Sequence, residues 1–152
     1  DHHLKVGMMV EVPAAVLMID HFVDEVDFIS IGTNDLTQYT FAADRGNAHV
    51  AHIGDPLHPA VLRQIARVID AAHATGKWVG LCGELAGRPE GVPVLLGLGL
   101  DEFSMSASSV PGAKALLARL SVPEAQKLAQ RVLNLPDAAA VKTAVKTFVE
   151  TL

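Results

Sequence analysis

The chain has 152 residues, of which 50% are hydrophobic and 5% aromatic, and its formal net charge is −5 at pH 7. This length suits one domain, and the apolar content allows a real core and argues against disorder. The acidic balance, without a patch of basic residues, gives no indication of nucleic-acid binding. The single cysteine excludes an internal disulfide and fits a reducing compartment. Since no signal peptide or membrane span is recognisable, we expect a soluble cytoplasmic protein.

Four short apolar runs lack the alternation of a half-exposed strand, which is typical of buried parallel strands covered by helices. Helical patterns fall between these runs and predict a parallel sheet joined by right-handed crossovers. The expected strands are residues 4–11, 27–32, 78–83 and 102–105. The expected helices between and after them are residues 13–26, 58–76, 90–99 and 108–120.

Several of these helices carry signals at their ends. Pro13 suits a first helical turn, because its missing N–H costs little there. Gly76 fits the position just after a helix C-terminus, and Ser108 or Ser109 could cap the helix that follows them. Two more amphipathic helices are expected within residues 121–152.

Four strand–helix units make half of a (β/α)8 barrel, whereas a closed barrel needs eight strands and about 250 residues. We therefore predict an α/β fold with a half-barrel in residues 1–120 and a C-terminal helical extension of the same domain in residues 121–152. An open half-barrel leaves two sheet edges unpaired. Either a partner completes the sheet or the chain is a fragment, and its immediate entry into a strand favours a fragment.

Polar side chains follow the strands at their C-terminal ends, where α/β barrels carry their active sites. Glu11 ends the first strand, Asn34 and Asp35 follow the second, and Cys82 lies at the end of the third. Because neighbouring parallel strands lie about 4.8 Å apart, one cation could touch both Glu11 and Asp35. Hard oxygen ligands suit Mg²⁺ (magnesium), which also takes waters and a substrate phosphate. Alternatively, both acids only cap the following helices, although capping explains Glu11 poorly.

Arg45 and Cys82 each allow two interpretations when only the residue type is considered. Residues 39–57 show little regular pattern, which is typical of a functional or disordered loop. Arg45 in this segment is either a bidentate phosphate donor or a solvated loop charge. Cys82 is either an inert core thiol or a group that exchanges a proton at the functional edge.

The chain resembles one family in five separated blocks: GMMVEVPAA, DFISIGTNDLTQYTFAADRGN, HPAVLRQI, GKWVGLCGELAG and GLGLDEFSMS. They look like the C-terminal, phosphoenolpyruvate-binding barrel of Enzyme I of the bacterial sugar phosphotransferase system, a phosphoenolpyruvate–protein phosphotransferase. The resemblance runs from about Val6 to Leu120 and implies the C-terminal half of a TIM barrel. Pyruvate phosphate dikinase and phosphoenolpyruvate synthase share the GTNDLTQ and CGE blocks, so a fragment of that type is an alternative. A dimerisation or structural module is another.

The resemblance implies a role for each matching residue. Glu11 and Asp35 would bind a catalytic Mg²⁺ ion. Asn34 and Arg45 would hold the phosphate of phosphoenolpyruvate, so that they and Asp35 form the substrate site. Cys82 would protonate the enolpyruvate carbon as pyruvate forms. These roles agree with phosphoryl transfer, which needs positioning and charge neutralisation more than covalent chemistry.

The chain also departs from the family. The resemblance implies further substrate arginines on earlier strands and an acceptor histidine in a separate N-terminal domain, and none of the seven histidines matches the acceptor motif. We therefore expect the chain alone to transfer no phosphate to the phosphocarrier protein HPr, and to bind Mg²⁺ and phosphoenolpyruvate weakly or not at all. Because subunits of the family associate through this barrel, a homodimer is expected.

Overall fold

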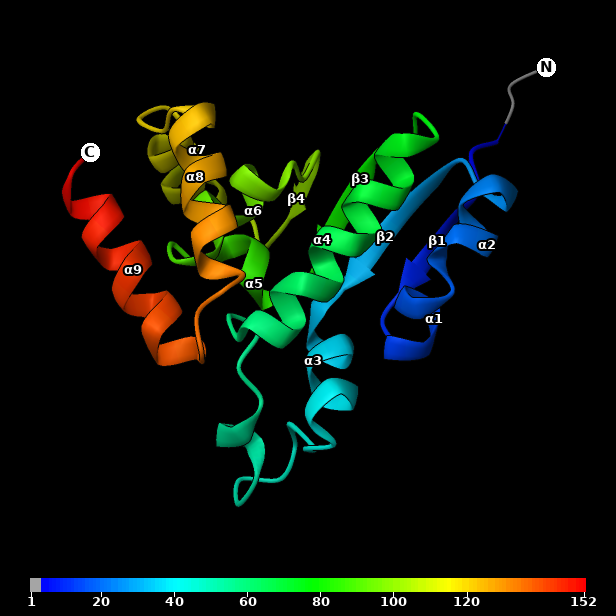
Figure 1. Cartoon of the computed structure of the whole chain (residues 1–152), viewed down its shortest axis with the longest axis horizontal. Helices are drawn as coiled ribbons and strands as arrows, with labels where there is room; N and C mark the ends of the chain where they lie inside the picture. The colour runs from blue at the N-terminus through cyan, green and yellow to red at the C-terminus, as the bar shows by residue number, and fades with distance from the viewer. Residues whose placement is uncertain (1–3) are drawn as a thin grey trace.

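A parallel sheet of four strands forms the centre of the chain (Figure 1). The structure is a computed structural model that describes residues 4–152, so the first residues of the predicted range 1–120 lie outside it. All neighbouring strands are parallel and follow one another in chain order, which confirms the predicted α/β fold. The strands are β1 (Gly7–Val10), β2 (Phe28–Gly32), β3 (Val79–Cys82) and β4 (Glu102–Ser104).

Helices occupy the connections and the C-terminal part of the chain. The α-helices are α1 (Pro13–Leu17), α2 (Ile19–Phe22), α3 (Thr33–Phe41), α4 (Pro59–Ala74), α5 (Glu84–Gly87), α6 (Gly91–Leu98), α7 (Val110–Leu117), α8 (Val122–Val132) and α9 (Ala138–Glu150). Two 3-10 turns, η1 (Val23–Glu25) and η2 (Ala51–Ile53), lie in the connections. The helix predicted over residues 58–76 is confirmed: Gly76 follows α4 with a φ of 72°.

Three details of the predicted helices are wrong. The segment 13–26 is broken, because Met18 has a φ of −100° and a ψ of 13° between α1 and α2. Neither α3 nor α5 was predicted, since both are short and polar or glycine-containing and lack a long apolar stripe. Ser109 occupies the N-cap position of α7, but its hydroxyl bonds that of Ser106 at 2.9 Å instead of a helix N–H.

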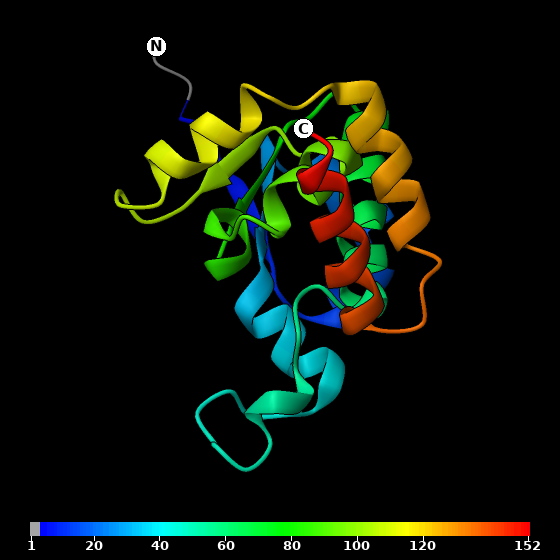
Figure 2. The same ribbon diagram turned by 90° about the vertical axis from the view of Figure 1, so that its left-hand side faces the viewer.

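Only one face of the sheet is covered within residues 4–152. Ile29, Ile31 and Leu81 are buried, and α4 lies over their face in both ribbon views (Figures 1 and 2). The opposite face carries the partly exposed Ser30 and Cys82, and both Glu102 and Ser104 of β4 are exposed. The expectation of buried strands was therefore wrong on this face, where Met9 of β1 is exposed as well, because a half-barrel leaves its interior face without a cover.

The C-terminal helices pack onto the covered side. Helix α8 crosses α6 so closely that a Cβ at Gly97 would lie 2.0 Å from the carbonyl oxygen of Ala125. Val132 and Val145 belong to the same hydrophobic core as the sheet residues. Within the described part of the chain, the helices are too short or too polar to cross a membrane.

Candidate functional site

The candidate site lies at the C-terminal edge of the sheet. Gly32 at the end of β2 pairs with Cys82 at the end of β3, and Glu11 follows β1 beside them. A Cβ added to Gly32 would lie 2.8 Å from Oε2 of Glu11, so the Glu11 side chain folds across this glycine. The missing side chain at Gly32 thus allows the carboxylate to reach the start of α3.

Helix α3 begins directly after β2 and carries two of the predicted residues in its first turn. The Oδ1 atom of Asn34 accepts the backbone N–H of Glu84 at 3.3 Å, which joins the ends of β2 and β3. Val12 and Gly32 occupy the N-cap positions of α1 and α3, and neither helix has a side-chain cap hydrogen bond. Neither Glu11 nor Asp35 is thus an N-cap residue, although Asp35 lies in the first turn of α3, where an acidic side chain interacts favourably with the helix dipole.

Arg45 comes back to the same edge from the loop that follows α3. Its Nη2 atom lies 3.6 Å from Oδ1 of Asp35, and its backbone N–H donates to Oε1 of Gln38 at 3.1 Å. The side chains of Arg45 and Asp35 remain 57% and 37% exposed. An ion pair this exposed stabilises the fold little, so both groups can rearrange around a ligand at small cost.

Two hollows open beside these residues. The one of about 310 Å³ is lined by residues of α3, the loop after it and the segment after β3: Asn34, Thr37, Gln38, Ala43, Arg45, Ala51, Gly54, Pro56, Glu84 and Arg88. The other, of about 510 Å³, extends toward the end of β4 and is also lined by Asn34, Glu84 and Arg88. The buried hydroxyl of Thr37 has no hydrogen-bond partner among the described residues.

Arg88 was not among the sequence candidates, although it lines both hollows. Its guanidinium Nε lies 4.0 Å from Oε2 of Glu90, which is a weak ion pair. Arg88 follows the short helix α5, which begins at the last residue of the CGE block. An arginine so close to the predicted end of a strand is the sequence feature that could have identified it. The hollow that Arg45 lines therefore has a second cation in its wall.

Cys82 lies on the uncovered face of the sheet and not in the hydrophobic core. Its Sγ atom is 3.6 Å from Sδ of Met9 and 3.7 Å from the hydroxyl oxygen of Ser30. The residue is half-buried, which leaves the thiol accessible from the open side. The thiol therefore lies outside the hydrophobic core of the described residues.

The donor set at this edge fits Mg²⁺. Among residues 4–152, no cluster of three or more His, Cys, Asp or Glu side chains could enclose a metal. Glu11 and Asp35 nevertheless supply two hard oxygen donors, and Mg²⁺ is usually held by one or two carboxylates together with waters and substrate phosphates. A structural zinc site, which needs four nitrogen or sulfur ligands, does not fit these residues.

Taken together, the fold and the site define an open α/β half-barrel whose strand ends gather acidic, amide and guanidinium groups. Residues 1–122 match the family described as PEP-utilising enzyme, PEP-binding domain, and the chain belongs to this family. The polar residues lie at the C-terminal ends of the strands, where α/β barrels carry their active sites. This location agrees with membership of a family of PEP-binding domains.

Several relatives are named phosphoenolpyruvate-protein phosphotransferase. The chain is 58% identical over 143 residues to the one from Geobacillus stearothermophilus, 52% over 143 residues to that from Bacillus subtilis, and 51% over 148 residues to that from Haemophilus influenzae. These matches cover 94–97% of this chain but only 25–26% of the relatives. The resemblance inferred from the sequence blocks is thus confirmed, and the chain spans about a quarter of the length of these relatives.

Proposed function

We propose that the chain is the part of a cytoplasmic phosphoenolpyruvate–protein phosphotransferase that holds Mg²⁺ and phosphoenolpyruvate. The observation that carries the proposal is that Asn34 and Arg45 line one hollow at the C-terminal edge of the sheet, while Asp35 pairs with Arg45 at 3.6 Å. Such an arrangement offers a phosphate both a bidentate cation and an amide, next to two carboxylates for a metal. The names of the relatives favour this activity over that of a dikinase or synthase.

Each residue has a separate task in this proposal. The Arg45 guanidinium and the Asn34 side-chain amide hold the phosphate, which positions the phosphoryl group for transfer. Glu11 and Asp35 hold the metal, which supplies charge neutralisation at the phosphate oxygens when bound. Once the phosphoryl group has left for a histidine of a separate domain, the Cys82 thiol gives its proton to the enolpyruvate carbon. Pyruvate and a thiolate result.

The site works together with other domains and proteins. The phosphoryl group passes through the histidine-bearing domain to the phosphocarrier protein HPr as part of sugar uptake, and the subunits form a homodimer. Residues 121–152 extend the domain formed by residues 1–120, which is supported by the packing of α8 on α6. The chain alone transfers no phosphate, because the acceptor histidine belongs to the separate domain.

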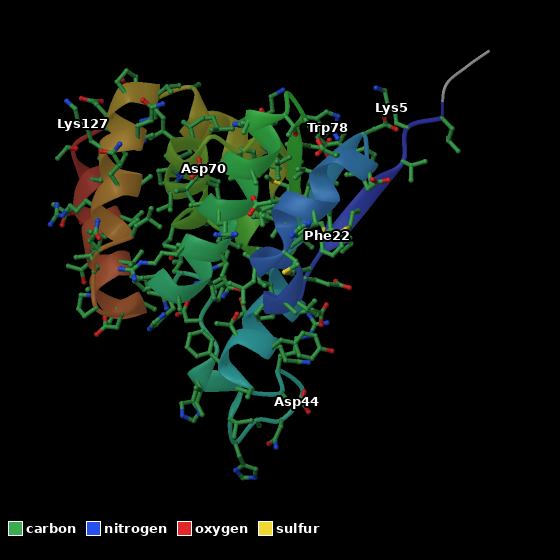
Figure 3. All side chains as sticks on the ribbon, turned by 45° about the vertical axis from the view of Figure 1, so that its right-hand side comes forward. Lys5, Phe22, Asp44, Asp70, Trp78 and Lys127 are labelled. Atoms are coloured by element: carbon green, nitrogen blue, oxygen red, sulfur yellow. The ribbon has the colours of Figure 1, made fainter. Side chains whose placement is uncertain are left out.

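The test of this function is calorimetric titration of phosphoenolpyruvate with and without Mg²⁺. It uses the chain itself and a chimera in which the chain replaces the matching segment of the Bacillus subtilis relative. We expect binding that requires Mg²⁺ and is lost in Asp35→Ala but kept in Asp70→Ala, since Asp70 is exposed on α4 (Figure 3). Binding by the chimera that persists without Mg²⁺ or in Asp35→Ala would refute the proposed site.

A further inference from the structure

An ion pair joins the C-terminal helix to the loop beside the candidate site. Nζ of Lys142 on α9 lies 2.5 Å from Oδ2 of Asp55, although the two residues are 87 positions apart in the sequence. The Asp55 side chain is only 23% exposed, which makes this pair less screened than the others on the surface. The ion pair thus connects α9 with the segment between α3 and α4, which no sequence pattern relates to each other.

Asp55 is fixed from several sides. Its Oδ1 atom accepts the backbone N–H of Leu57 at 3.0 Å, and its carbonyl oxygen accepts that of His58 at 3.0 Å. Partial burial acts to raise the pKa of Asp55, but the hydrogen bonds from Lys142 and Leu57 and the charges of Lys142 and Arg88 together hold it below its usual value. The carboxylate therefore stays ionised at neutral pH and keeps its attraction for Lys142.

The neighbours of Asp55 form a wall of the hollow at the site. Gly54 and Pro56, on either side of Asp55, line the same hollow as Asn34 and Arg45. A displacement of Asp55 must therefore move this wall relative to the phosphate-binding groups. Figure 2 shows why an anchor matters here: the connection between α3 and α4 projects from the body of the molecule before it turns back toward the lower end of α9.

We propose that Lys142 is a positioning residue, which holds the Gly54–Pro56 wall of the hollow through Asp55 and thereby raises the affinity of the site for phosphoenolpyruvate. This inference rests on the proposed function for its ligand. Helix α9 would thus contribute to the site, although its residues are far from the other site residues in the sequence. Because the ion pair acts on the wall and not on the ligand, Lys142 affects how well the groups are placed.

The position of the wall is tested first, without any ligand. Hydrogen exchange of residues 51–57 is measured in the chain carrying Lys142→Met, Lys142→Arg or Lys146→Met. Lys146 is a matched control on the same helix, where it forms an exposed pair with Glu150 at 3.9 Å. We expect faster exchange in Lys142→Met alone, because arginine can keep the ion pair. Unchanged exchange in Lys142→Met would overturn the inference.

The effect on affinity is then measured in the chimera by titration with phosphoenolpyruvate and Mg²⁺. We expect Lys142→Met to raise the Kd about tenfold, whereas Lys142→Arg and Lys146→Met stay close to the unsubstituted protein. Equal Kd values in all four proteins would overturn the positioning role. If the unsubstituted chimera binds no phosphoenolpyruvate, the proposed function fails, and the exchange experiment still decides whether Lys142 holds the wall.

Discussion

Nη2 of Arg45 lies 3.6 Å from Oδ1 of Asp35, beside a hollow that Arg45 lines, although Arg45 lies in a loop and Asp35 in the first turn of α3. Each thus neutralises the other when no ligand is present. In the proposed function, a phosphate accompanied by Mg²⁺ would offer each of them a new partner of opposite charge, and the pair would separate without leaving either group unpaired. This exchange of partners gives a direct prediction for Arg45.

Arg45→Lys should weaken phosphoenolpyruvate binding by the chimera roughly 10- to 100-fold, which corresponds to about 1.5–3 kcal/mol for a hydrogen bond to a charged group. Lysine keeps the positive charge but lacks the planar fork that bonds two phosphate oxygens at once. Calorimetric titration measures the change. An unaltered Kd would show that Arg45 is only a solvated loop charge.

Cys82→Ala should leave phosphoenolpyruvate binding intact and slow protonation of the enol, because general acid catalysis typically contributes about 10²- to 10⁴-fold. The readout is the handedness of the pyruvate methyl group that the chimera forms in tritiated water from phosphoenolpyruvate with deuterium at one of its two vinyl positions, since protium, deuterium and tritium together make that methyl group chiral. We expect facial selectivity in the unsubstituted chimera and its loss in the variant, as enol released into water is protonated on both faces. Selectivity retained by Cys82→Ala would assign the proton to another group.

Gly83→Ala should destabilise the fold by about 1–3 kcal/mol or more. Gly83 has a φ of 138°, and a Cβ there would lie 2.2 Å from Oγ1 of Thr33. Urea unfolding followed by the fluorescence of Trp78, which stacks on Phe28 with a centroid separation of 4.5 Å, measures the change. Gly112→Ala is the control, since a Cβ at this position in α7 meets no atom within 4 Å. Equal stability of the two variants would contradict the close approach at Gly83.

Asp101→Asn should reduce the loss of stability in acid. Burial acts to raise the pKa of Asp101, but hydrogen bonds from His73 and the Val79 N–H, together with the charge of His73, hold it below the usual value of 3.8. A lowered carboxyl pKa stabilises the fold above the unfolded-state value, and this contribution is lost as the pH falls through the lower folded value. Below pH 3.8, the unsubstituted chain should therefore lose stability more steeply than the variant.

Urea midpoints measured from about pH 6 to about pH 2 test this expectation. Asp70→Asn, which removes an exposed charge from the helix that also carries His73, is the control and should follow the unsubstituted chain. If Asp101→Asn shows the same pH dependence as the control, the link between Asp101 and acid stability is wrong.

Much of the fold could be predicted because its signals are local. The apolar stripe of α4, from Val61 to Ala72, is buried as its spacing predicts, and Gly76 ends that helix through its own backbone freedom. The four strands were recognised from short apolar runs. The placement of Glu11, Asp35 and Cys82 at one edge then followed from parallel topology, since the carboxyl ends of parallel strands share an edge.

The sequence alone thus determined the family, the order of strands and helices, and the residues at the strand ends. Helices α3 and α5 could be identified only from the tertiary structure, because their apolar patterns are too weak to predict a helix without the elements that pack on them. The tertiary structure also decided the pairing of Arg45 with Asp35 and of Lys142 with Asp55. Such contacts carry no periodic signal, because they depend on how the loop after α3 returns to the sheet and where α9 docks.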